Sequence, residues 1–456
     1  MTVLAALTVF ACEASGIEDG PLLHPLFSDR MVLQRDRQTL IWGWSKPLSR
    51  VTAEFDGRKY HTRTGRDGRW RLRLPPKNAG EDFNITVTSA GEQETLHNVA
   101  AGEVWLCSGQ SNMDWPVSRS STANEDIAAA PNPHLRLYVV RRARSETPRA
   151  IMDYPRRWQI SNPETVRQFS AACYHFGKEL QSQLGVPVGL IQATQGGSPI
   201  RAWMREPLAE DTAPQKKGRK YFEPASLYNA MIHPLTPYAL RGVVWYQGET
   251  DARASSKYES NLRQIIEDWR GAFDQKLHFQ IVQIANFGPA TAIATNSGWA
   301  RIREAQRRVA RKDDNAELVV TIDLGESENV HPANKADIGK RTAMSALATL
   351  YGQPASLSPT YKSHEITGGD VRISFDHLSG GLRLQNGASV NGFAWCPKNE
   401  KCRRVKASIS SDDTVVVDVA ADKFAGELRY GWANNPIVNL YDGSGLPVEP
   451  FSIRLP

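Results

Sequence analysis

Apolar and polar residues alternate with a period of two over residues 22–100. Trp70, Leu72 and Leu74, for example, alternate with arginines, and Asp-Gly and Pro-Pro pairs separate one run from the next. Alternation of this kind puts the apolar side chains on one face of a strand, and such pairs form tight turns. Short strands at this spacing predict a β-sandwich-like domain over residues 21–100.

The period changes after Gly102. Five apolar runs then have the composition of strands buried on both faces of a sheet: 104–107, 186–193, 242–247, 279–284 and 318–323. Four stretches show the apolar stripe of an amphipathic helix: 169–184, 258–273, 299–309 and 344–351. Strands that alternate with helices predict an α/β domain with a mostly parallel sheet over residues 101–353. In such a sheet the ligand binds at the carboxyl ends of the strands.

Period two returns from about residue 354, as at Val415, Val417 and Val419. This pattern predicts a C-terminal β-rich segment over residues 354–456. A chain of 456 residues exceeds the size at which a single core usually stops growing, so more than one domain is expected. The pattern leaves open whether the two β-rich segments form one accessory domain.

The first residues, MTVLAALTVFACEASG, contain an apolar run followed by small residues but no basic start. Residues 1–20 are therefore interpreted as a signal or lipoprotein segment, with Cys12 as a candidate lipid anchor. No other stretch reaches the roughly 20 apolar residues that span a bilayer. These features favour export, to the periplasm or outside the cell.

The other four cysteines fall into two kinds of context. Cys396 and Cys402 bracket a short charged turn, which predicts a disulfide across a hairpin. Cys107 and Cys173 lie in apolar patterns and are predicted to be buried free thiols. No HxxxH or CxxC spacing indicates a metal site, and nothing indicates a cofactor. The net charge of +6 is mild and comes without a dense basic block, so no nucleic-acid partner is predicted.

Polar groups follow most of the predicted buried strands. Ser111 follows the first, Gly196 and Gly197 the second, Gln247 the third and His331 the fifth. Because parallel strands end at one edge of the sheet, these groups are expected to lie together. A serine hydroxyl becomes a nucleophile when a base takes its proton and a third group orients that base. The pattern predicts Ser111 as nucleophile and His331 as base.

The remaining parts of a hydrolytic site have candidates as well. Glu328 lies three residues before His331, from where a carboxylate can reach the imidazole Nδ1–H. An attacked carbonyl also needs hydrogen-bond donors for its developing negative charge. The candidates are the backbone N–H of Ser111, that of Gly197 (or Gly196) and the side-chain amide of Gln247. Asn112 is expected to brace the nucleophile turn.

The groups at the strand ends belong to six longer blocks, which are, in order, GEVWLCSGQSNM, GLIQATQGGSPIRAWM, LYNAMIHPL, GVVWYQGETDA, IREAQ and VHPANKADIGKR. Together these blocks resemble the sialate O-acetylesterase family, a branch of the SGNH-hydrolase superfamily. The resemblance extends to FSDRMVLQRD near the start and LRYGWANNPIVNLYDGSGLPVEPF near the end, so it covers nearly the whole chain. It implies an SGNH-like three-layer α/β/α domain that removes O-acetyl groups from carbohydrates. By position it implies Ser111 as nucleophile, His331 as base, and Gly197 and Gln247 as oxyanion donors.

The chain departs from the family pattern in two places. The family commonly has an aspartate two or three residues before the histidine, where this chain has Asn329 and Glu328. The acid is therefore interpreted as Glu328, with Asp323 or Glu326 as alternatives. Gln195 and Arg201 stand where the family usually has a tryptophan and an acid. Both changes touch the expected substrate pocket.

Five residues near the strand ends have side chains that suit either substrate contact or a structural role. Arg201, Trp203 and Trp115 are candidates to bind a sugar by hydrogen bonds and stacking, although Trp203 can equally cover the core and Arg201 form a solvated rim. Glu249 is a further candidate, with structural support as the alternative that we favour. Asn229 is interpreted as fixing a buried loop.

The function expected from these observations is that of a serine carbohydrate O-acetylesterase acting through an acyl-enzyme. The substrate is an acetylated plant cell-wall glycan such as xylan or xyloglucan, with O-acetylated sialic acid as the alternative; only family analogy favours the plant glycan. An alternative of a different class is a non-catalytic carbohydrate-binding protein. The oligomeric state is left open.

Overall fold

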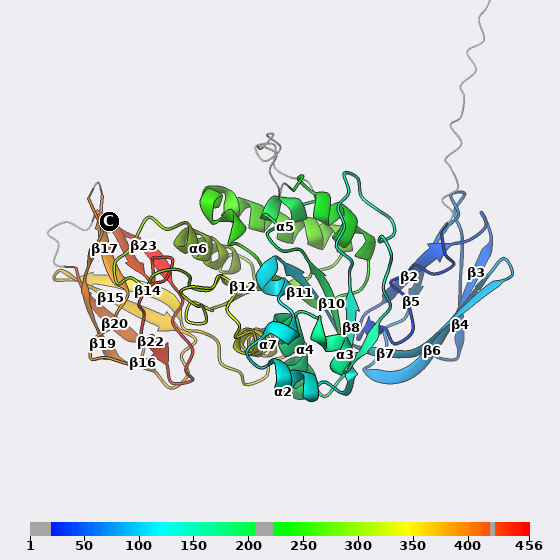
Figure 1. The fold of residues 1–456 in the computed structure, drawn as a ribbon, viewed down its shortest axis with the longest axis horizontal. Coiled ribbons are helices and arrows are strands. Elements are labelled where there is room, and N and C mark those ends of the chain that lie inside the picture. Colours follow the sequence, from blue (N-terminus) through cyan, green and yellow to red (C-terminus); the bar gives the residue numbers. More distant parts are fainter. Residues whose placement is uncertain (1–19, 206–221, 399, 420–424) are drawn as a thin grey trace, which may run out of the picture.

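The computed structural model describes residues 20–205, 222–398, 400–419 and 425–456. The predicted signal segment, apart from Gly20, and Cys12 lie outside these residues. At the centre of the molecule is a mostly parallel sheet (Figure 1). Its strands in spatial order are β13 (Ala316–Val319), β12 (His278–Val282), β11 (Gly242–Tyr246), β7 (Glu92–Gly109), β10 (Val188–Thr194), β8 (Asn132–Val139) and β9 (Gln159–Ser161). The sheet is parallel throughout except for β9, which pairs antiparallel with β8.

Helices cover both faces of the central sheet (Figure 1). The longer ones are α4 (Ala171–Leu184), α5 (Tyr258–Phe273), α6 (Gly298–Ala310) and α7 (Ala336–Leu350). Successive residues of β11 point to opposite faces: Val243 and Trp245 pack into the core that holds α5 and α6, and Val244 and Tyr246 into the core that holds α4 and α7. This arrangement explains why the strand sequence is apolar without interruption. The α/β prediction for this region is confirmed.

Each of the five predicted buried strands and each of the four predicted helices is present. β8 was missed, because its sequence, NPHLRLYV, begins with polar residues and has no uninterrupted apolar run. Three short helices, α1 (Ser111–Asp114), α2 (Ala123–Ala128) and α3 (Pro163–Arg167), were also below the length that periodicity can detect.

The N-terminal β-rich region shares a strand with the central sheet. Strands β1 (Val32–Gln34), β3 (Arg50–Phe55), β4 (Arg58–Arg63) and β6 (Gly80–Ser89) form a sheet with the first part of β7. β2 (Thr39–Trp44) and β5 (Arg69–Leu74) form a separate two-stranded sheet. The second part of β7 continues between β10 and β11. The boundary expected after residue 100 therefore falls inside one strand of 18 residues.

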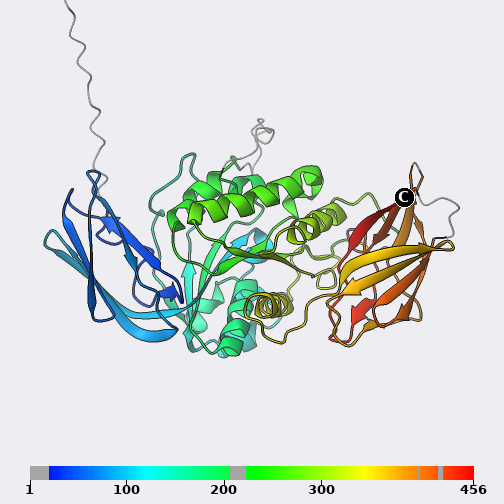
Figure 2. The same cartoon turned by 180° about the vertical axis from the view of Figure 1, so that it is seen from behind.

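The C-terminal β-rich region has a core of its own. Two four-stranded antiparallel sheets and a two-stranded sheet surround that core. Their strands are β14 (Thr360–Thr367), β15 (Asp370–Asp376), β20 (Thr414–Asp418) and β19 (Lys406–Ser411); β18 (Arg403–Arg404), β17 (Phe393–Pro397), β21 (Gly426–Tyr430) and β23 (Phe451–Leu455); and β16 (Leu382–Leu384) with β22 (Leu440–Asp442). Figures 1 and 2 show the two β-rich regions at opposite ends of the molecule, so they do not form one accessory domain.

A buried arginine fastens the C-terminal region to the central domain. Arg303, on α6, donates hydrogen bonds to the carbonyls of Ile284 and Ala285 at the end of β12 and to those of Ala433 and Asn434. Burial lowers the pKa of its guanidinium to about 9. Four carbonyls supply the acceptors that a buried cation needs.

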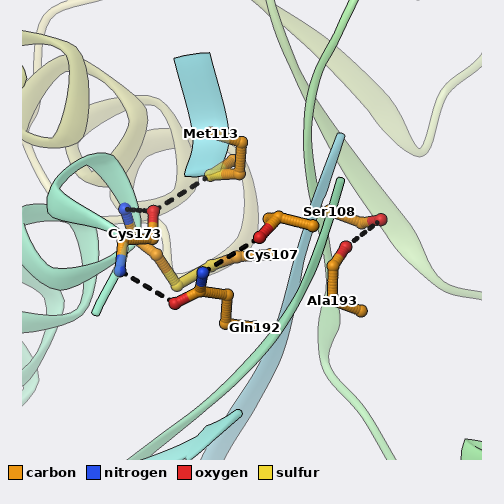
Figure 3. Close-up of a disulfide and its surroundings, with 8 residues drawn as sticks. Cys107, Ser108, Met113, Cys173, Gln192 and Ala193 are labelled. Atoms are coloured by element: carbon orange, nitrogen blue, oxygen red, sulfur yellow. Dashed lines mark hydrogen bonds between the residues drawn. A yellow bond between two sulfur atoms is a disulfide. The ribbon is translucent and has the colours of Figure 1, made fainter. Parts of the chain in front are cut away.

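The cysteine predictions have mixed outcomes. The disulfide between Cys396 and Cys402 is confirmed. The prediction that Cys107 and Cys173 are free thiols is wrong, because a disulfide joins them with a Cα–Cα distance of 6.0 Å. Figure 3 shows this bond between the end of β7 and α4. Sixty-six positions separate the two cysteines in the sequence, so only the packing of α4 against the sheet reveals the pair.

We predict that the Cys107–Cys173 bond stabilises the fold more than the Cys396–Cys402 bond does. Loop closure over 66 positions contributes about 4 kcal/mol in the chain-entropy description, against about 2 kcal/mol over 6 positions. Cys107→Ala/Cys173→Ala should therefore lower the free energy of unfolding in urea by about 2 kcal/mol more than Cys396→Ala/Cys402→Ala. Equal losses in the two double variants would contradict the prediction.

Candidate active site

The nucleophile candidate lies at the carboxyl end of β7. Ser111 is the first residue of the one-turn helix α1, directly after the buried Gln110. Gly109 makes the turn with a φ of +139°, and a Cβ at this position would lie 2.1 Å from the carbonyl oxygen of Tyr246. Only glycine fits this approach between β7 and β11. The turn therefore presents Ser111 at the edge of the sheet where the sequence predicts chemistry.

His331 reaches the same edge from the loop between β13 and α7. Its Nε2 lies 2.8 Å from the Oγ of Ser111, although 220 positions separate the two residues. The ring of Trp115 stacks on the imidazole, with ring centroids 5.3 Å apart and planes inclined by 22°. The structure thus brings together a hydroxyl and an imidazole in the geometry that proton transfer requires.

The residues around His331 hold its backbone in place. The side chain of Asn329 accepts a hydrogen bond from the N–H of His331 and donates one to its carbonyl. Glu326 accepts hydrogen bonds from Asn329 and from the N–H of Ala333. The loop that carries His331 is therefore held by hydrogen bonds from two of its own side chains.

The three acids considered as partners of His331 have different surroundings. Asp323 forms a bidentate ion pair with Arg341, and Glu326 accepts a hydrogen bond from the N–H of Ala333. Glu328 is exposed. No hydrogen bond or ion pair that we find among the described residues joins Glu328 to His331. The role of Glu328 as orienting acid therefore stays a prediction.

The candidate oxyanion donors differ in availability. Within the described part of the chain, the N–H groups of Ser111 and Gly197 take part in no backbone hydrogen bond. Gly197 has a φ of +70°, and a Cβ at Gly196 would lie 3.7 Å from that of Ser111, so this turn runs close to the nucleophile. Both N–H groups remain candidates for binding a developing oxyanion.

Gln247 is fully buried, and its side chain serves the framework. Its Nε2 donates to Gln110 Oε1, to the carbonyl of Ser198 and to Asp251. An amide nitrogen has two hydrogens, so these acceptors exhaust its donors. In this arrangement the side chain of Gln247 connects the segments that contain Gln110, Ser198 and Asp251, and it has no hydrogen left to donate to an oxyanion.

A buried polar chain lies directly behind the nucleophile. Asn112 donates hydrogen bonds to Glu249 and to the carbonyl of Val330, and its Oδ1 accepts one of 2.7 Å from the ammonium of Lys335. Asn112 thereby braces the nucleophile turn, as expected, and links it to the residue before His331. Glu249 is part of this support, which was the favoured alternative for it.

Burial perturbs both ends of this chain. It raises the pKa of Glu249 and lowers the pKa of Lys335 to about 7, while their mutual attraction opposes the shift of Lys335. Lys335 was missed as a site residue. The signal available was its position four residues after His331, but a lysine at the start of a helix is usually exposed, and only the packing shows that this one is fully buried.

The other predicted substrate contacts lie in different places. Trp203 is fully buried, and its indole N–H donates to Ser198, so its ring is not open to a sugar. Arg201 is also buried and donates to the carbonyl of Phe222. Asn229 bonds the carbonyls of Ser145 and Glu146, which fits its predicted loop-fixing role. Trp115 alone among the aromatic candidates lies beside the Ser111–His331 pair.

A charged pair missed by sequence reasoning stands next to the nucleophile. Asp114, on α1, forms a 2.6 Å ion pair with Arg142, whose side chain is 59% exposed. Its other oxygen accepts a hydrogen bond from Thr194 at the end of β10. Arg142 lies in a loop without periodicity, so nothing in the sequence connects it with α1.

We predict that Lys335 makes stability depend on pH above neutrality. Its pKa is lower in the folded chain than in the unfolded chain, so between about pH 7 and 10.5 the unfolded chain binds more protons. The free energy of unfolding contributed by Lys335 should therefore rise with pH in this window, by at most about 1.4 kcal/mol per pH unit.

Urea unfolding at pH 7, 8 and 9 measures this effect. Wild-type stability should rise relative to Lys335→Met as the pH rises. Lys340→Met, which removes an exposed lysine of the same helix, should run parallel to wild type. Parallel curves for wild type and Lys335→Met would contradict the prediction.

Comparison with known proteins identifies the family of the chain. Residues 101–348, more than half of the chain, match the family described as carbohydrate esterase, sialic acid-specific acetylesterase. The sialate O-acetylesterases of Pongo abelii and Homo sapiens are 27% and 26% identical, each over 98% of this chain and 94% of the relative. A solved carbohydrate acetylesterase from Xanthomonas citri is 35% identical, with a TM-score of 0.85 over 94% of this chain and 99% of that one. The chain therefore belongs to the sialic acid-specific acetylesterase family of carbohydrate esterases and is a carboxylic ester hydrolase.

Proposed function

We propose that this protein removes O-acetyl groups from a carbohydrate by serine catalysis at an SGNH-type site, with Ser111 as nucleophile and His331 as base. The observation that carries the proposal is the distance of 2.8 Å between the Oγ of Ser111 and the Nε2 of His331. The two residues come from separate loops at one edge of the parallel sheet, which is where ligands bind in such folds. The family of the chain supports acetate esters of sugars as the substrate class.

The reaction runs in two steps. In the first, Nε2 of His331 takes the proton of Ser111 while Oγ attacks the acetyl carbonyl, and the N–H groups of Ser111 and Gly197 bind the oxyanion. Collapse of the tetrahedral intermediate breaks the ester bond, and the imidazolium returns its proton to the departing sugar hydroxyl. In the second step, His331 takes a proton from water, which attacks the acetyl-serine. The tetrahedral intermediate then collapses, acetate leaves, and the imidazolium returns its proton to the Oγ of Ser111.

Glu328 is proposed as the carboxylate that supports the imidazolium during both steps. Asp323 forms an ion pair with Arg341, and Glu326 bonds the loop that carries His331. Glu328 is exposed, and we find no ion pair between it and any residue that the structure describes. An exposed carboxylate acts through a more polar medium than a buried one, so its effect on catalysis is expected to be moderate.

We predict that Glu328→Gln lowers kcat/KM for a nitrophenyl acetate by about tenfold, which corresponds to about 1.4 kcal/mol of transition-state stabilisation. The matched control is Glu365→Gln, an exposed acid on β14 that should leave the rate unchanged. A Glu328→Gln enzyme with wild-type kcat/KM would remove Glu328 from the mechanism.

The identity of the sugar is the finer part of the proposal. We favour a neutral acetylated plant glycan such as xyloglucan or xylan. The position of Arg201 supports this choice: a cation near the site could pair with a sialate carboxylate, but Arg201 is buried and donates to the carbonyl of Phe222. O-acetylated sialic acid is the second candidate, since the mammalian relatives are named for it and since Arg142 and Arg119 lie near the site.

Export of the protein is also proposed. Two disulfides favour an oxidising compartment, such as the periplasm or the extracellular space. Within the described residues no helix combines the length and apolar character needed to cross a bilayer.

Acetate release from a panel of substrates tests the function. The panel is a nitrophenyl acetate, acetylated xyloglucan, acetylated xylan and an O-acetylated sialic acid, each with wild type, Ser111→Ala and the exposed-serine control Ser363→Ala. We expect wild type and the control to release acetate from a neutral glycan, and Ser111→Ala to lose at least about a thousandfold in rate.

The outcomes separate the alternatives. Release from sialic acid but not from the neutral glycans would select the second candidate substrate. Equal release by wild type and Ser111→Ala would overturn the nucleophile. No release from any substrate would favour a non-catalytic carbohydrate-binding protein.

A further inference from the structure

An open cavity of about 750 Å³ lies between the N-terminal β-rich region and the central domain. One wall is the two-stranded β2–β5 sheet, which Figure 1 shows on the side of the N-terminal region that faces the centre. The other wall contains Thr236 and Pro237, which precede β11, and Phe273 to Gln275, which precede β12. These segments enter the amino ends of the strands, so the cavity lies at the edge of the sheet opposite to Ser111.

The register of β2 and β5 sets an alternating arginine and apolar pattern along the first wall. Leu40 pairs with Arg73, Trp42 with Arg71, and Trp44 with Arg69, and all six line the cavity. Residues at facing positions of an antiparallel pair point to the same side of the sheet. The period-two pattern of RWRLRL therefore serves two purposes: Trp70, Leu72 and Leu74 fill the core, and the arginines face the cavity.

Arginines outnumber carboxylates among the described residues that line the cavity. Arg37 and Arg205 line the cavity together with the three arginines of β5. Among the lining residues that the structure describes, the only carboxylate is that of Asp274. Burial and the repulsion of Arg241 lower the pKa of Arg37. Arg71 and Arg73 are exposed and form no ion pair that we find with a described acid. A bound anion would offset this repulsion at little desolvation cost.

The rest of the lining contains aromatic and polar groups. Trp42 and Trp44 border the cavity, but both side chains are largely buried, at 8% and 5% exposure, and His24 packs against both rings. The Nε1–H of Trp44 is buried and donates no hydrogen bond to a described acceptor. The volume is typical of small-ligand sites, which occupy about 300–1,000 Å³. Arginine forks bind carboxylates through two parallel hydrogen bonds.

We propose that this cavity is a second, non-catalytic site for a carboxylate-bearing saccharide, such as a short uronic-acid oligosaccharide. The exposed Arg71 and Arg73 bind the carboxylates, and the sugar rings lie in the cavity beside them. The inference goes beyond the ester chemistry, because none of its residues takes part in the Ser111–His331 pair.

Calorimetric titration of the full chain carrying Ser111→Ala tests the proposal. The probes are trigalacturonic acid, a neutral trisaccharide and inorganic phosphate. We expect trigalacturonic acid to bind at least tenfold more tightly than either of the others. Adding Arg71→Gln and Arg73→Gln should raise its Kd at least tenfold. The matched control adds Arg58→Gln and Arg63→Gln, exposed arginines of β4 outside the cavity, and should bind as before.

Three results would overturn the site. Equal binding of the acidic and neutral trisaccharides would remove the role of charge, and equal binding of phosphate would reduce the cavity to a general anion contact. An unchanged Kd of trigalacturonic acid for the variant with Arg71→Gln and Arg73→Gln would show that the ligand does not bind in this cavity. The same pair of substitutions in the otherwise wild-type enzyme should keep full nitrophenyl acetate hydrolysis, so failure of this site and failure of the esterase mechanism are read separately.

Discussion

The candidate active site depends on the burial of one long strand, β7. From Val99 to Gln110 every residue of this strand and its turn is buried, and β10 and β11 bond to it on both sides in parallel register. Gly109 then permits the close approach to Tyr246 that turns the chain toward Ser111. A shift of β7 by one residue relative to its neighbours would break its hydrogen-bond register and turn its buried side chains to the opposite face of the sheet. The packing of the core therefore fixes the position of the nucleophile.

The second half of the site is held by contacts from several parts of the chain. Asn112 bonds the carbonyl of Val330, next to His331, so the nucleophile turn and the histidine loop are joined directly. The C-terminal region contributes as well. The side-chain amide of Asn435 donates hydrogen bonds to the carbonyl of Gly288 and to the hydroxyl of Ser327, which lies in the same loop as His331. The accessory domain thus helps to fix the loop that carries the proposed base.

The chemistry and the substrate choice rest on different residues. The proposed ester cleavage uses Ser111, His331 and the N–H groups of two turns, all held by the sheet edge. At the rim of the site, Trp115 stacks on His331 and Arg142 pairs with Asp114, and these are the residues that we propose for contact with the sugar. The arginine-lined cavity lies at the opposite edge of the sheet.

The apolar runs and helical stripes were enough to predict five strands of the parallel sheet, its four longer helices and the edge at which Ser111 and His331 meet, because burial on both faces leaves an uninterrupted apolar run. The bond between Cys107 and Cys173, the burial of Lys335 beside Asn112, and the framework contacts of Trp203 and Gln247 are visible only in the packed structure. Each of these depends on which side chains from distant segments face one another. Residue type and spacing describe a strand or helix locally, whereas contacts across 66 or 223 positions arise only when the elements pack.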